Sequence, residues 1–152
     1  MPAPFQIIPA TLAETSAILR LEPLCYPRPW EEKLIRPFLV AANLPNKGYV
    51  ARVLKENDVV IAYAFASRQE SQLLVERLGV QPEHRRKQIG AGLMVSLIFT
   101  AQDWKLPAIT CSLDEANLTG QLFLKAGRFQ ALPVSEEARS QKVVQFARSA
   151  KG

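Results

Sequence analysis

The 152-residue sequence has few cysteines and no apolar segment long enough to cross a membrane. Its two cysteines, Cys25 and Cys111, are too few for a disulfide framework, and we expect both to be buried free thiols. The longest strongly apolar segment without a charge, residues 89–101, is shorter than the roughly 20 residues that span a bilayer. Residues 1–10 have neither the basic nor the apolar region of a signal peptide. These absences predict a cytoplasmic protein with no membrane partner.

The composition is that of an ordinary globular protein with a basic excess. Hydrophobic residues make up 48% and charged residues 22%, which excludes disordered and low-complexity chains, so we expect residues 1–152 to form one domain. Nineteen Lys and Arg against 14 Asp and Glu give a net charge of +5, which favours an anionic partner. A phosphorylated ligand and nucleic acid both qualify. The basic residues have no aromatic residues interleaved and form no nucleic-acid reader motif, so nucleic acid is the less favoured partner.

Apolar periodicity and turn residues predict the order β-α-α-β-β-β-α-β-α-β-β. Thr11 and Glu14 form a capping box at the first helix, which Pro23 is expected to stop. Pro29 is expected to open the second helix, and Pro37 to kink or split it. The predicted strands are 5–8, 49–54, 59–67, 73–80, 108–113, 129–134 and 142–147, and the later helices are 89–104 and 117–125. This order predicts an α/β (α+β) fold, with one mixed sheet and helices on both of its faces.

The segment VQPEHRRKQIGAGLM, residues 80–94, has the features of an anion-binding site. A strand ends, a basic loop follows, and a helix with two glycines near its start begins. The first amides of a helix are unpaired, its dipole favours negative charge there, and glycine lets the backbone approach a phosphate. Arg85, Arg86 and Lys87 add formal charge. The segment therefore predicts a diphosphate site, although a solvated basic loop would have the same composition.

This segment resembles motif A of the Gcn5-related N-acetyltransferases, whose core is Gln/Arg-x-x-Gly-x-Gly/Ala. Arg85 matches its first position and Gly90 its last, whereas Gln88 replaces its first glycine. Residues 117–129 resemble the family's Asn-x-x-Ala-x-x-Leu-Tyr-x-x-x-Gly-Phe. Residues 29–39 resemble the second helix of the ribosomal-protein alanine acetyltransferase branch. The resemblance covers nearly the whole chain and implies the family's mixed sheet, splayed between its fourth and fifth strands.

The resemblance also implies an activity and a set of binding residues. Acetyl-CoA would enter the splay and donate its acetyl group to a primary amine of a small molecule, peptide or protein, by direct transfer in a ternary complex. The Val80 amide would polarise the thioester carbonyl. No metal is implied, and the sequence is compatible with a homodimer. The residues expected to bind the cofactor are Leu78, Gly79, Val80, Arg85, Arg86, Lys87, Gln88, Ile89, Gly90, Ala91, Gly92, Asn117 and Phe123.

A general acid for the leaving thiolate has no clear candidate. The tyrosine that the family commonly uses falls at Leu124, or at Phe123 with a one-residue shift, and neither side chain carries a proton. The glutamate that serves as base in the alanine acetyltransferase branch falls at Ser112. Ser112 and Tyr26 are the remaining candidates for a donor. A catalytically weak acyl-CoA-binding module is therefore the alternative to a full enzyme.

Glu76 is the candidate general base. Strand alternation places it on one face with Leu78 and Val80, so it would act on the amine if that face lines the cleft. A structural ion pair in the sheet is the alternative. His84, the only histidine, is expected to contact phosphate or solvent rather than to act as the base.

Overall fold

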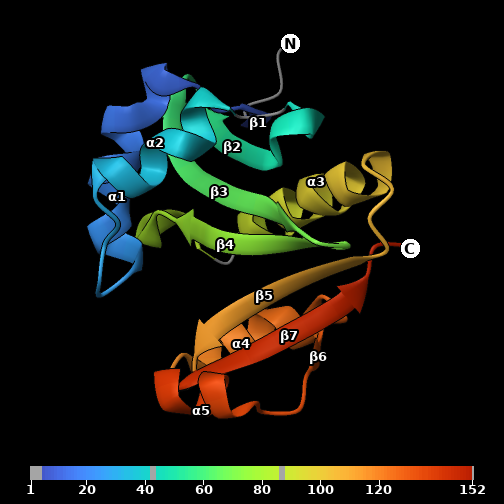
Figure 1. Cartoon of the computed structure of the whole chain (residues 1–152). Helices are drawn as coiled ribbons and strands as arrows, with labels where there is room; N and C mark the ends of the chain where they lie inside the picture. The colour runs from blue at the N-terminus through green and yellow to red at the C-terminus, as the bar shows by residue number, and fades with distance from the viewer. Residues whose placement is uncertain (1–4, 42–43, 86–87, 152) are drawn as a thin grey trace.

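The computed structural model describes residues 5–41, 44–85 and 88–151. These residues form a seven-stranded mixed sheet in the order β1-β2-β3-β4-β5-β7-β6 (Figure 1). All neighbouring strands are antiparallel except β4 and β5, which are parallel. The strands are β1 (Phe5–Pro9), β2 (Tyr49–Glu56), β3 (Val59–Gln69), β4 (Gln72–Val80), β5 (Ala108–Asp114), β6 (Gln130–Ala131) and β7 (Val143–Ser149). The predicted mixed sheet is confirmed.

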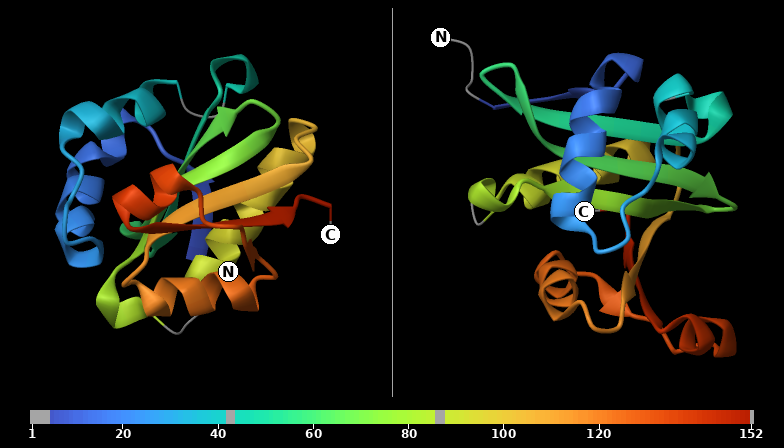
Figure 2. Two further views of the ribbon diagram at one scale, coloured as in Figure 1. Left: turned by 60° about the horizontal axis from the view of Figure 1, so that its bottom comes forward. Right: turned by 90° about the vertical axis from the view of Figure 1, so that its left-hand side faces the viewer.

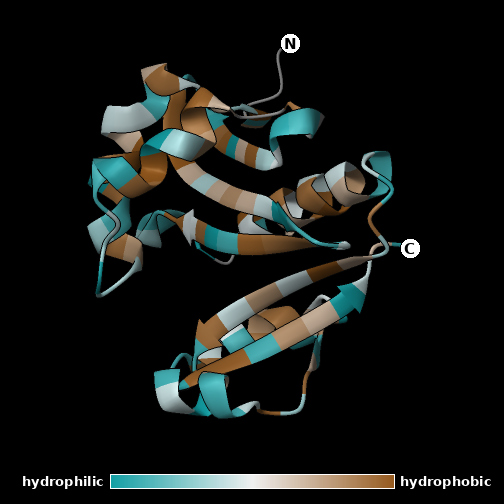
Figure 3. Ribbon diagram, viewed as in Figure 1, coloured by the Kyte–Doolittle hydropathy of each residue, from teal (hydrophilic) through white to brown (hydrophobic). Residues whose placement is uncertain are grey.

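Helices lie on both faces of the sheet, as predicted (Figure 2). Residues of α1 and α2 share one apolar core with one face of β2 and β3, and residues of α3 and α4 share a second core with the opposite face. Apolar residues recur along the central strands, between these helix layers (Figure 3). The helices are α1 (Thr15–Cys25), α2 (Glu32–Val40), α3 (Ile89–Asp103), α4 (Leu118–Ala126) and α5 (Glu136–Gln141), with 3₁₀ turns η1 (Leu12–Glu14), η2 (Pro45–Lys47) and η3 (Pro82–His84). None of the helices in these described ranges is long and apolar enough to span a bilayer.

Two prolines lie inside helices: Pro23 does not stop α1 as expected, and Pro37, expected to kink or split α2, does not split it. Pro23 lies within α1, whose last turn closes where the Tyr26 N–H donates to the Glu22 carbonyl at 2.9 Å. Pro37 lies within α2, which begins at Glu32 rather than at Pro29. Each proline removes one backbone hydrogen bond, but both helices bury an apolar face against the sheet, and that burial holds them together.

The C-terminal region contains a helix that the sequence analysis missed. The predicted strand 129–134 is only Gln130–Ala131, and α5 follows it. The signal was present, because Ser135 accepts the Ala138 N–H at 3.0 Å and two glutamates follow Ser135 in the first turn.

β4 and β5 diverge toward their carboxyl ends (Figure 1). Their ladder covers only Gln72–Val75 and Ala108–Cys111. Beyond that point β5 stays paired with β7, while β4 continues to Val80 without pairing to β5. The splay implied by the family resemblance is therefore present, and it exposes one edge of β4.

Candidate functional site

The open edge of β4 presents the backbone groups of Leu78 and Val80. In an antiparallel ladder, successive residues direct their N–H and C=O groups alternately toward and away from the partner strand. The Gln81 N–H donates to the Ile61 carbonyl of β3 at 2.8 Å, so the backbone groups of Val80 and Leu78 point away from β3. They face the gap that opens between β4 and β5.

The end of α1 lies against this edge. The Tyr26 hydroxyl accepts the Leu78 N–H at 3.0 Å and donates to the Leu78 carbonyl at 3.0 Å. The Val80 carbonyl accepts the Arg85 Nε–H at 3.2 Å and the Cys25 thiol at 3.5 Å. Burial raises the pKa of Tyr26 to about 12, so its hydroxyl remains protonated at neutral pH and can donate.

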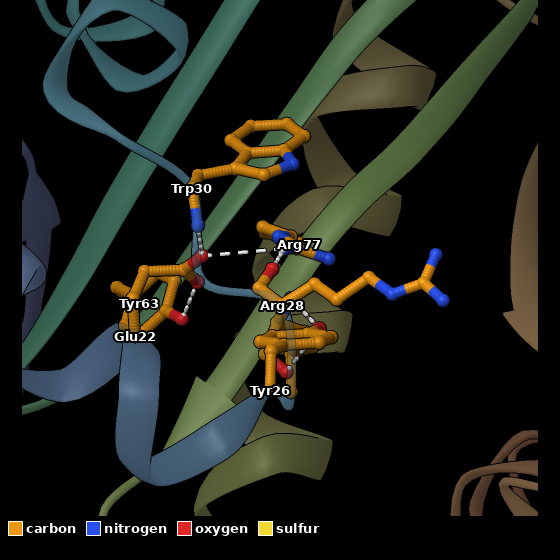
Figure 4. A network of polar contacts seen from close by, with 7 residues as sticks. Glu22, Tyr26, Arg28, Trp30, Tyr63 and Arg77 are labelled. Atoms are coloured by element: carbon orange, nitrogen blue, oxygen red, sulfur yellow. Dashed lines mark hydrogen bonds and ion pairs between the residues drawn. The ribbon is translucent and has the colours of Figure 1, made fainter.

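A buried carboxylate fastens the loop between α1 and α2 (Figure 4). Glu22 is completely buried and accepts the Trp30 N–H at 2.7 Å and the Tyr63 hydroxyl. Arg77 Nη2 lies 3.3 Å from Glu22 Oε1 and offsets its charge. Burial and the Glu22 carboxylate raise the pKa of Tyr63 above its usual range, which keeps this hydroxyl a donor.

Arg77 links this carboxylate to two aromatic rings. Its guanidinium carbon lies 3.8 Å from the centroid of the Tyr26 ring and 4.6 Å from that of Trp30 (Figure 4). Its Nη2 also donates to the Arg28 carbonyl at 2.8 Å. These contacts hold Tyr26 in place on β4. Sequence analysis missed the Glu22–Arg77 pair, because two residues so far apart in the chain leave no local pattern.

Gly79 lies beneath Tyr63 rather than on the open edge. A Cβ at Gly79 would lie 2.7 Å from the Tyr63 ring, so only glycine leaves room for that ring. Gly79 pairs with Tyr63 in the β3–β4 ladder, and its backbone groups point toward β3. Gly79 thus makes room for Tyr63, which donates to Glu22, whereas Leu78 and Val80 form the open edge of β4.

The prediction that Glu76 shares a face with Leu78 and Val80 is wrong, because β4 has a bulge. Leu78 and Val80 pack against the α3 core, whereas Glu76 Oε2 accepts the Ser67 hydroxyl at 2.6 Å. One extra residue in a strand reverses the alternation that follows. The pairs that flank the irregularity are Ala66↔Val75 and Phe65↔Arg77. The role of Glu76 as a base remains a prediction.

The predicted anion loop begins directly after the open edge. Arg86 and Lys87 lie outside the described residues. Ile89 is buried in the core, and the first turn of α3 runs on through Gly90, Ala91 and Gly92. The first backbone hydrogen bond of the helix runs from the Gly92 N–H to the Gln88 carbonyl, so the amides before Gly92 have no acceptor within the helix. His84 lies 3.3 Å (Nδ1) from Glu56 Oε2 of β2. The start of α3 therefore has amides without intrahelical acceptors, and their binding of a diphosphate remains a prediction.

Gln88 adopts the left-handed conformation at the N-cap of α3, with φ 61° and ψ 21°. This conformation costs an L-residue about 1–2 kcal/mol of strain, which glycine does not have. Glycine loses more conformational entropy on folding, which reduces the gain from such a substitution by about 0.5–1 kcal/mol. We expect Gln88→Gly to raise the free energy of unfolding by about 0.5–1 kcal/mol in urea denaturation. Gln88→Ala, which keeps the strain, should give no such gain. A less stable Gln88→Gly protein would mean that the glutamine side chain contributes more than its strain costs.

Phe123 of α4 reaches the splay, and Leu124 does not. A Cβ on Gly90 would lie 3.4 Å from the Phe123 ring and 3.6 Å from Leu78 Cδ2, so these three residues meet at the start of α3. Leu124 is buried in the core. The position that faces the gap thus carries a phenyl ring with no proton to donate.

The two remaining predicted residues lie on the far side of the gap. Asn117 Oδ1 accepts the Gly120 N–H at 2.8 Å and caps α4. Ser112 is exposed on β5, one residue beyond the last pair with β4, Val75↔Cys111. The structure therefore brings together Leu78, Gly90 and Phe123, and the Tyr26 hydroxyl lies against the backbone of Leu78.

Comparisons with known proteins agree with this geometry. Residues 15–127, more than half of the chain, match the model of the "Acetyltransferase (GNAT) family". A search of curated proteins finds no significant match. Three similar solved structures share the fold at low sequence identity. They are the ribosomal-protein-S18-alanine N-acetyltransferase of Escherichia coli (15% identity, 97% of this chain and 95% of that chain, TM-score 0.78), the PaiA N-acetyltransferase of Thermoplasma acidophilum with coenzyme A (10%, 95% and 98%, 0.83), and Naa50 of Arabidopsis thaliana with the bisubstrate analogue CoA-Ac-MVNAL (13%, 97% and 99%, 0.79). The chain belongs to the acetyltransferase (GNAT) family and is an acyl-CoA N-acetyltransferase.

Proposed function

We propose that the protein transfers the acetyl group of acetyl-CoA directly to a primary amine in a ternary complex. The observation that carries this proposal is the open edge of β4, where Leu78 and Val80 direct backbone groups into the gap beside β5. The pantetheine arm contains amide groups, which can pair with such an edge as an added strand does. The Val80 N–H would then polarise the thioester carbonyl as an oxyanion donor.

The start of α3 is the proposed diphosphate site. The first amides of α3, which have no intrahelical acceptors, follow Gln88, and Arg85 lies beside Val80 at the end of the open edge. Gly90 leaves this turn close to Phe123 and Leu78. An acyl donor with its diphosphate at α3 can thus run its arm along β4.

Direct transfer is supported by the state of the two thiols. Burial raises the pKa of Cys111 to about 12, and burial also raises that of Cys25. A thiol attacks as the thiolate, so both groups are poor nucleophiles at neutral pH. A covalent acyl-enzyme on either cysteine is therefore disfavoured.

For the acceptor, we propose the α-amino group of a polypeptide. Two of the similar structures are an alanine N-acetyltransferase of a ribosomal protein and a complex with a peptide-bearing analogue. The buried carboxylate beside this loop, Glu22 of α1, is engaged by Arg77, Trp30 and Tyr63. Because this carboxylate is already paired, it is not available to bind the ammonium group of a polyamine or of a lysine side chain.

A second candidate is an acyl-CoA-binding module with weak activity. It is favoured by Phe123, which occupies the gap-facing position of α4 without a proton to donate. Loss of a general acid typically lowers a rate by about 10²–10⁴-fold, so the two candidates differ in turnover rather than in binding.

Thiol release from acetyl-CoA distinguishes these functions. We expect release with peptides that have a free amino terminus, and acetylation at that terminus in mass spectra. The same peptides with a blocked terminus and an internal lysine, and a polyamine, serve as matched controls and should react far more slowly. If coenzyme A raises the melting temperature but no amine is acetylated, the binding module is correct. If coenzyme A does not bind, both candidates fail.

A further inference from the structure

The side chain of Tyr26 takes the place of a ligand on the open edge of β4. An unpaired strand edge leaves N–H and C=O groups that need partners, and leaving them buried without partners is costly. Here one hydroxyl satisfies both groups of Leu78, each at 3.0 Å. An extended arm with amide groups would need the same two backbone groups.

Contacts between the end of α1 and the open edge of β4 continue beyond Leu78 to Val80. The Val80 carbonyl already accepts from the Cys25 thiol and from Arg85, and Arg85 also donates to the Leu24 carbonyl at 3.4 Å. The last residues of α1 are thereby fastened to the last residues of β4. A donor arm cannot pair with Leu78 while these contacts persist.

The loop that carries Tyr26 also carries Trp30, and Arg77 contacts both rings. Arg77 lies between the rings of Tyr26 and Trp30 and is held by Glu22 and the Arg28 carbonyl (Figure 4). If Tyr26 leaves Leu78, the stack loses one of its two rings. Displacement of Tyr26 from the edge should therefore change the surroundings of Trp30.

We infer that Tyr26 is a latch, which competes with the pantetheine arm of the acyl donor for Leu78 and is displaced when the donor binds. This inference rests on the proposed function. The latch contacts must be broken when the donor binds, and the free energy of breaking them reduces the net binding free energy. The latch therefore lowers the affinity for the donor.

Tyr26→Phe tests the competition. It removes the hydroxyl and keeps the ring beneath Arg77, so the Kd for coenzyme A should fall by about 3- to 10-fold. Tyr49→Phe is the matched control, because Tyr49 packs against Phe38 away from this edge, and its Kd should stay within about twofold of the parent. Adenosine 3′,5′-diphosphate, which lacks the pantetheine arm, should bind Tyr26→Phe and the parent equally.

Trp30 fluorescence gives a second measurement that keeps Tyr26 intact. In a Trp104→Phe background, coenzyme A should change the emission of Trp30, and the nucleotide without the arm should not. An unchanged or weaker affinity of Tyr26→Phe for coenzyme A, or a Trp30 change with the nucleotide alone, overturns the latch and leaves the proposed function standing. If the parent protein does not bind coenzyme A, the proposed function fails and the latch fails with it.

Discussion

Arg77→Met is expected to lower the free energy of unfolding by about 3–5 kcal/mol in urea denaturation. Glu22 is completely buried, and Arg77 is the cation that offsets its charge at 3.3 Å. Methionine keeps much of the side-chain volume but leaves a carboxylate in the core with hydrogen bonds from Trp30 and Tyr63 and no counter-charge. Removal of one partner of a buried pair costs more than the pair is worth.

The exposed pair Glu31–Lys33 is the matched control. Its side chains are 76% and 79% exposed and lie 3.7 Å apart, so Lys33→Met should change stability by less than about 1 kcal/mol. The double variant Glu22→Gln/Arg77→Met should regain part of the loss, since glutamine has no charge to offset. A cost below about 1 kcal/mol for Arg77→Met alone would show that the pair does not hold the loop on β4.

Val80→Pro is expected to lower kcat/KM for acetyl transfer by about 10²- to 10³-fold. Proline removes the N–H at this position, which points away from β3 into the gap, and it also replaces the valine side chain and fixes φ. The ladder bonds on either side, through Gly79 and Gln81, are preserved. The loss would therefore report the proposed contact with the thioester carbonyl rather than a broken sheet.

Val80→Ala keeps the N–H and should retain activity within about threefold, because only side-chain packing changes. Melting temperatures of both variants check that the fold is intact. Unimpaired transfer by a folded Val80→Pro protein would move the polarising role to another donor, of which the Leu78 N–H on the same edge is the next to test.

Local patterns predicted most of the elements that build the site. The capping box of Thr11 and Glu14 is formed, with the Thr11 N–H donating to Glu14 Oε1 at 2.9 Å. Asn57 and Asp58 take the left-handed conformation of a tight hairpin turn between β2 and β3. The helix at Ile89 begins where the basic loop ends. Each of these features depends on residues within a few positions of one another, so the sequence records it directly.

Two of the errors have a different origin, since they depend on a partner strand or on packing. Glu76 faces Ser67 because the β3–β4 pairing contains an extra residue, and a bulge has no signal in one strand alone. Pro23 and Pro37 remain inside helices because the sheet packs against those helices. The missed helix α5 is different, because its signal is local: Ser135 is a typical N-cap residue and two glutamates follow it.

By itself, the sequence determined the order of the elements other than α5, the basic loop before Ile89 and the absence of a tyrosine at both candidate positions in α4, Phe123 and Leu124. Only the tertiary structure placed the Tyr26 hydroxyl on Leu78 and the Arg77 cation against Glu22. Turns, caps and helix starts are decided by backbone preferences of adjacent residues. Contacts between α1 and β4 join residues about fifty positions apart, and they form only because apolar burial brings that helix onto the sheet.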